Sequence, residues 1–148
     1  MRLRVTLALA LTAAPVASMR LSADWKATDG FRDASFCSFD PARYQGMIND
    51  DARTSAFAEA IHRAIRGREG ELVVLDIGTG PAALLALIAA RAGARRVYAV
   101  EVQSEVAALA REAVAQAVVE GDVEDGVVQV FEGFSTALEC ASNPLIHP

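Results

Sequence analysis

The chain has 148 residues, 53% of them hydrophobic, and a formal net charge of −5. This length and composition suit one domain with a packed core and exclude a disordered protein. The acidic balance excludes nucleic acid as an expected partner, because binding a phosphate backbone requires an excess of Lys and Arg. With two cysteines and two histidines, we expect neither a disulfide framework nor a metal site, and a single disulfide between Cys37 and Cys140 stays open.

Residues 1–19 have the order of a secretory signal peptide. Two arginines precede an apolar run from Val5 to Ala14, and small residues follow it. Because no acidic residue precedes Asp24, an organelle transit leader fits as well, and so does an ordinary apolar helix or a misassigned start of the reading frame. The run is too short, and too soon interrupted by Pro15, to span a bilayer. We therefore expect no membrane span in the mature chain.

Residues 20–42 mix polar and aromatic side chains without a sustained period, which indicates a connector. A helical pattern then begins at Asn49, which can cap a helix, and Gly67 ends it. The predicted apolar face of this helix consists of Ala56, Phe57, Ala60, Ile61, Ala64 and Ile65.

Arg53 precedes Phe57 by four residues and so lies on the same inward face of the helix. A guanidinium directed toward a core needs an anion that offsets its desolvation. The carboxylate of a ligand is one candidate, held by two parallel hydrogen bonds. A salt bridge to Asp76 or Glu101, or a side chain that extends to water, is the alternative.

Three apolar segments of strand length alternate with two helical patterns farther along the chain. We predict strands at 72–78, 95–102 and 126–133 and a helix at 81–92. A second helix, capped by Ser104, has an apolar stripe of Val106, Leu109, Ala113 and Ala117. This alternation predicts an α/β fold with right-handed crossovers and a parallel sheet in the order 3-2-1, which is half of a doubly wound sheet with flanking helices.

The stretch LDIGTG places two glycines between the first strand and the following helix. Gly78 and Gly80 have no side chain that would keep a ligand away from the backbone amides. Glu101 ends the next strand, 25 residues after Asp76, where an acidic side chain can accept hydrogen bonds from both hydroxyls of a ribose. A turn that binds nothing and a solvated glutamate are the alternatives.

The type of nucleoside follows from the rest of the loop. A dinucleotide fingerprint requires a glycine where this chain has Ala83. An acid on the first strand before G-x-G fits a loop for S-adenosylmethionine better, with Asp76 orienting the loop or reaching the amino acid moiety through water. A dinucleotide-binding fold stays a more distant alternative.

Four stretches together resemble one known family, the protein arginine N-methyltransferases. They are YQGMINDDARTSAF, VVLDIGTG, ARAGARRVYAVE and VVQVFEG, which follow the family's order and spacing from Tyr44 to Glu139. The resemblance covers only the N-terminal, cofactor-binding part of that family. It implies a Rossmann-like class I methyltransferase fold, truncated to about three strands, with residues 43–148 as a partial domain that binds S-adenosyl-L-methionine.

The resemblance also implies a set of site residues and a substrate. The expected cofactor site consists of Tyr44, Arg53, Asp76, Gly78, Gly80, Glu101, Ser135 and Thr136. Arg53 would bind the methionine carboxylate, Glu101 the ribose hydroxyls, and the residues after the third strand would lie near the adenine. Met47 would lie near the transferred methyl group, and Tyr44 would close over the cofactor. The implied substrate is an arginine side chain of a protein.

The chain departs from the family in two respects. Pro81 and Ala82 replace the usual Thr and Gly of the loop, so an added methyl group approaches the cofactor. The family's paired catalytic glutamates and its barrel domain follow the segment that corresponds to this chain, so we expect a fragment without the substrate-binding half and no dimer. Whether the chain is itself an enzyme therefore stays open.

Two alternative functions follow from these departures. One is a non-catalytic module that binds S-adenosylmethionine, and the other is a class I methyltransferase that acts on another substrate. A sheet of three strands with open edges also predicts a chain that is marginally stable or aggregates when expressed alone. The family implies the cytoplasm or nucleus, whereas a genuine leader implies the secretory route or an organelle.

Overall fold

The computed structural model describes residues 19–21, 40–135 and 138–140, with only the backbone described for the first and last of these segments. The predicted leader up to residue 18, most of the predicted connector, Cys37 and Thr136 lie outside the described residues. The side chain of Cys140 is not described either, so the disulfide stays undecided.

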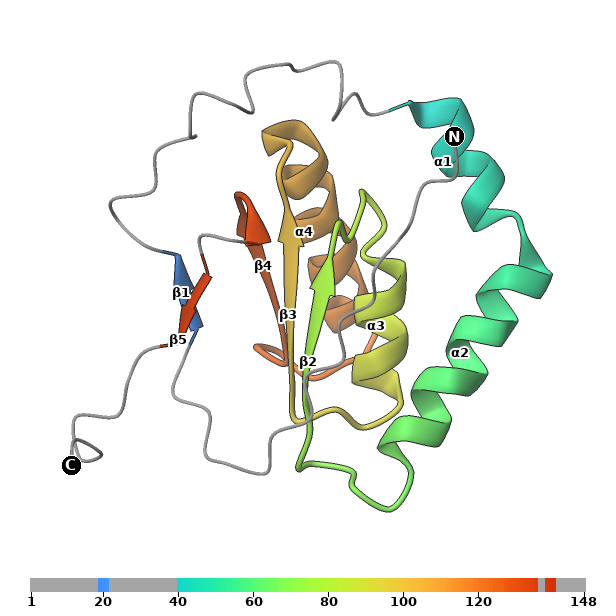
Figure 1. Ribbon diagram of the computed structural model, residues 1–148, viewed down its shortest axis with the longest axis vertical. Helices are drawn as coiled ribbons and strands as arrows, with labels where there is room; N and C mark the ends of the chain where they lie inside the picture. The colour runs from blue at the N-terminus through green and yellow to red at the C-terminus, as the bar shows by residue number, and fades with distance from the viewer. Residues whose placement is uncertain (1–18, 22–39, 136–137, 141–148) are drawn as a thin grey trace.

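A three-stranded parallel sheet forms the centre of the described fold (Figure 1). It consists of β2 (Val73–Ile77), β3 (Arg96–Glu101) and β4 (Val128–Glu132), in the order β2-β3-β4. All three predicted strands and their order are therefore confirmed. A short antiparallel ribbon of β1 (Met19–Leu21) and β5 (Leu138–Cys140) was not predicted.

The crossovers of the sheet are α3 (Leu84–Arg91) and α4 (Ser104–Val119). Pairing places Val74, Val97 and Val128 side by side, so these side chains point to one face of the sheet. They join one hydrophobic core with residues of α3 and α4, which places both helices on that face (Figure 1).

A further helix, α2 (Asp51–Ile65), packs against α3 through Ile61 and Ile65, which are 1% and 0% exposed. Phe57 and Ala64 are half-buried on the same face, but Ala56 and Ala60 are exposed. The assignment of these two alanines to the buried face was wrong. Helix α2 lies on the outside of the fold and contacts it along a narrow stripe, so many of its alanines face solvent.

The structure has an additional helix before the predicted one. A separate helix, α1 (Pro41–Ile48), begins inside the predicted connector, and Asp40 caps it by accepting hydrogen bonds from the N–H groups of Ala42 and Arg43. Asn49 ends α1, and Asp50 caps α2 by accepting from the Arg53 N–H at 2.9 Å. The prediction that Asn49 caps α2 was therefore wrong.

Two further helix predictions need correction. In α4 the buried residues are Val106, Ala107, Ala110 and Ala117, whereas Leu109 is 46% exposed. Ser104 is the first helical residue rather than the cap, and its hydroxyl donates to Glu132 Oε1 at 2.6 Å. The helix expected from residue 81 begins at Leu84, because residues 81–83 remain a turn.

Within the described residues, no helix is long and apolar enough to cross a membrane.

Candidate functional site

The glycine loop joins β2 to α3 at the carboxyl end of the sheet. Gly78 and Gly80 have φ angles of 74° and 69°, which glycine adopts without steric cost. Ala83 also has a left-handed conformation, with φ of 44°, and its side chain is fully buried. An alanine in this conformation costs about 1–2 kcal/mol, so the loop ends on a strained residue just before α3.

Asp76 is buried within the sheet directly before this loop, with 2% of its surface exposed. It accepts a hydrogen bond of 2.8 Å from the Thr79 hydroxyl, so its carboxylate ties the loop to the end of β2. Burial raises the pKa of the Asp76 carboxyl above its ordinary 3.8, and the charge of Glu101 adds to the rise. Hydrogen bonds from the Thr79 hydroxyl and the Ala86 backbone act in the opposite direction.

Glu101 connects the loop to the neighbouring strand. Its Oε2 accepts from the Gly80 N–H at 3.1 Å, and its Oε1 accepts from Val102 and Gln103 at 2.9 and 3.2 Å. A carboxylate offers about four lone-pair sites. Donors within residues 40–135 therefore use three of these sites and leave one site on Oε2 for a further donor.

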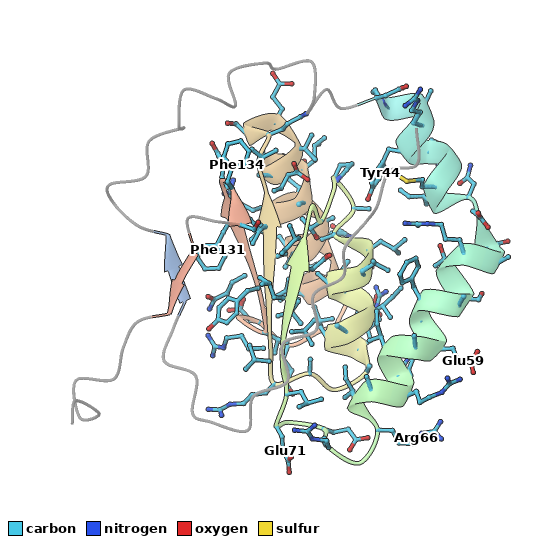
Figure 2. The ribbon with its side chains drawn as sticks, viewed as in Figure 1. Tyr44, Glu59, Arg66, Glu71, Phe131 and Phe134 are labelled. Atoms are coloured by element: carbon cyan, nitrogen blue, oxygen red, sulfur yellow. The ribbon has the colours of Figure 1, made fainter. Side chains whose placement is uncertain are left out.

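A small cavity of about 50 Å³ lies between α1, α2 and the loop. Its lining consists of Tyr44, Met47, Ile48, Arg53, Asp76, Gly78, Thr79, Leu84 and Leu85. Figure 2 shows Tyr44 reaching from α1 toward the loop. The Tyr44 hydroxyl accepts a hydrogen bond of 3.3 Å from the Ala82 N–H. Burial raises the pKa of the Tyr44 phenol, so the group is neutral at pH 7.

Arg53 is half-buried and opens onto the same cavity. Its guanidinium carbon lies 5.0 Å from the centre of the Phe57 ring, which is a cation–π contact. Among the described residues, no carboxylate lies within 4.0 Å of the guanidinium, so neither of the salt bridges considered as alternatives forms. The site therefore holds a cation beside an amide-rich loop.

The structure brings most of the predicted site residues together. Tyr44, Met47, Arg53, Asp76 and Gly78 line the cavity. Gly80 lies against the Tyr44 ring and donates to Glu101.

The two predicted site residues that follow β4 are not confirmed. Ser135 is described but does not line this cavity, and Thr136 lies outside the described residues. The sequence analysis missed Thr79 and three apolar lining residues. A hydroxyl three residues after a buried acid was the available signal for Thr79.

Together the parallel sheet, the glycine loop and the acid at the end of β3 define a Rossmann-like class I methyltransferase fold. The comparisons with known proteins agree. No family model matches the chain. The crystal structure of PRMT6-SAH superposes with a TM-score of 0.50 at 30% identity, over 64% of this chain and 25% of that one.

Part of the chain is also similar to curated relatives that share one family name. Probable protein arginine N-methyltransferase 6.1 of Oryza sativa subsp. indica is 43% identical over 93 residues, which is 58% of this chain and 24% of the relative. Arginine N(omega)-methyltransferase of Streptomyces achromogenes subsp. streptozoticus is 36% identical over 132 residues, which is 89% of this chain and 32% of the relative. The chain thus spans about a quarter to a third of the relatives it matches. Over that part it is similar to protein arginine N-methyltransferases, which confirms the resemblance read from the motifs.

Proposed function

We propose that the chain is the cofactor-binding part of an S-adenosylmethionine-dependent methyltransferase that acts on a guanidinium group. The observation that carries this proposal is Arg53, a half-buried cation that lines a cavity against the glycine loop and has no described carboxylate within 4.0 Å. A cation in such a position requires an anion, and the amino acid end of the cofactor carries a carboxylate.

The residues of the site fit the remaining parts of the cofactor. Gly78 leaves the loop backbone bare for close approach, because no described atom lies within 4 Å of the place where a Cβ atom would stand. The free lone-pair site on Glu101 Oε2 can accept one ribose hydroxyl while the carboxylate still holds the loop. A second direct hydrogen bond would have to displace the Gly80 N–H, so we propose a single direct contact between Glu101 and the ribose rather than two.

When bound, the cofactor would supply a methyl group on a positively charged sulfur. The described residues can hold and orient such a group, since Met47 and Leu84 provide apolar surface in the cavity and Arg53 provides the charge for the carboxylate. The proposed substrate, a guanidinium nitrogen, would enter from the Met47 side.

Calorimetric titration with S-adenosylhomocysteine tests the proposal on the 148-residue chain. Arg53→Ala should weaken binding by about 10- to 100-fold, because a hydrogen bond to a charged group contributes about 1.5–3 kcal/mol. Arg63→Ala is the matched control, since Arg63 lies on the same helix, is exposed and pairs with Glu59. Equal affinities for wild type and Arg53→Ala would remove Arg53 from the site, and no heat with any variant would refute cofactor binding.

The substrate has two candidates. Several matched relatives are named as protein arginine methyltransferases. One relative, which covers 89% of this chain, is named an arginine methyltransferase without the word protein, and this favours free arginine as a second candidate. Transfer of labelled methyl from S-adenosylmethionine to an Arg-Gly-rich peptide or to L-arginine distinguishes the two. Binding of the cofactor without transfer to either one would favour a non-catalytic module.

A further inference from the structure

The side chain of Tyr44 lies where the glycine loop is most open to a ligand. A methyl group built on Gly80 would overlap Tyr44 Cε2 and would lie 2.8 Å from both Cζ and the hydroxyl oxygen. The hydroxyl also accepts the hydrogen bond from the Ala82 N–H. The ring therefore contacts the bare backbone of the loop, and the hydroxyl occupies one of its amides.

This position conflicts with ligand binding. Glycine at a loop of this kind allows a ligand to approach the backbone closely, but at Gly80 the group that approaches is a side chain of the same protein. The cavity that remains has a volume of about 50 Å³, whereas sites for small ligands and cofactors usually enclose about 300–1,000 Å³. An adenosyl amino acid therefore does not fit this cavity as it stands, with the Tyr44 ring as part of its wall.

We propose, on the basis of the proposed function, that Tyr44 is an internal competitor of the cofactor, so that its ring must leave the loop before the cofactor binds. The chain then has a closed state, in which Tyr44 contacts Gly80 and Ala82, and an open state that binds.

The construction of α1 allows such a movement without opening the core. None of its residues is fully buried, and moving it exposes only the half-buried side chains of Tyr44, Met47 and Ile48. The two helices have separate caps, because Asp40 caps α1 and Asp50 caps α2. Residues 49–50 between them are therefore a hinge about which α1 can turn as an intact helix.

The closed state lowers the apparent affinity by the fraction of molecules that are open. The Tyr44 contact consists of one hydrogen bond and the packing of the ring. A contact of this strength keeps most molecules in the closed state, so the apparent affinity for the cofactor falls by about 3- to 10-fold.

Titration of three variants of the 148-residue chain with S-adenosylhomocysteine tests the proposal. Tyr44→Ala removes the ring and should bind about 3- to 10-fold more tightly than wild type. Tyr44→Phe keeps the ring but loses the hydroxyl and should fall between the two. Gln45→Ala is the control, because Gln45 lies on the same helix, is exposed and donates a hydrogen bond to Asn49, away from the loop. This variant should bind like wild type. Unchanged or weaker binding by Tyr44→Ala would overturn the proposal.

A second measurement needs no ligand. In the wild type the Ala82 amide should exchange its hydrogen slowly, in Tyr44→Phe it should exchange faster, and in Gln45→Ala it should match wild type. Equal exchange in all three would show that Tyr44 does not close the loop and would overturn the proposal. If no variant binds S-adenosylhomocysteine although Ala82 exchange responds to Tyr44→Phe, then the contact is real and the proposed function is what fails.

Discussion

The two glycines of the loop give a direct way to measure the contact of Tyr44. Both have positive φ angles, so alanine at either position costs about 1–2 kcal/mol in backbone strain. A Cβ atom at Gly78 would have no neighbour within 4 Å among the described residues, whereas at Gly80 it would overlap the Tyr44 ring. Gly80→Ala must therefore also displace that ring and break its hydrogen bond from Ala82, which contributes about 0.5–1.5 kcal/mol.

We expect the free energy of unfolding to fall by about 1–2 kcal/mol in Gly78→Ala and by about 1.5–3.5 kcal/mol in Gly80→Ala. Urea unfolding followed by far-ultraviolet circular dichroism measures both values. In a Tyr44→Ala background the two substitutions should cost the same, because the excess at Gly80 depends on the ring. An excess at Gly80 that persists without Tyr44 would refute this reasoning.

Three further predictions concern the fold and its charges. The pKa of Asp76 is raised on folding, so its contribution to stability is full below about pH 3.8 and is lost as the pH rises through the raised pKa. Asp76→Asn should therefore gain stability relative to wild type with rising pH. A difference in melting temperature that stays constant across pH would contradict this. Ile65→Ala should cost about 2–5 kcal/mol in urea unfolding, whereas Leu109→Ala should cost about 0.5 kcal/mol because Leu109 is 46% exposed; equal losses would place Leu109 in the core. Arg91 and Asp122 form a 2.8 Å ion pair that is 41% and 46% exposed, so a double-mutant cycle should give a coupling below about 1 kcal/mol that shrinks in 1 M salt; a larger coupling that is insensitive to salt would mean a shielded pair.

The sheet could be predicted because each strand is a short, nearly continuous apolar run that ends in a turn residue. Helix boundaries were harder. Asn49, Asp50 and Asp51 follow one another, and each is a good residue for capping a helix. Asp50 is the N-cap of α2 because Asn49 is already the C-terminal cap of α1, which the local sequence does not reveal. An alanine-rich helix such as α4 has no single apolar stripe. Which of its faces is buried therefore depends on how the helix packs against the sheet.

The candidate site could be predicted by residue type but not by contact. The glycines, the two acids and Arg53 have distinctive local patterns. The hydrogen bonds from the loop to Glu101 and Tyr44 join residues 21 and 38 positions apart, and no local pattern encodes such a pairing. Helix α1 was missed because it buries no residue and so has no periodic apolar signal, although Asp40 and Pro41 mark its start.

The shared carboxylate of Glu101 has a mechanical consequence. One side chain fixes both the turn that precedes α3 and the turn that precedes α4, so these two segments must shift together. Substitutions at residues 102–104 would then alter the shape of the glycine loop, and their effects on stability would not add to those of changes at Gly80. The geometry of the glycine loop is therefore set in part by the turn before α4, outside the loop itself.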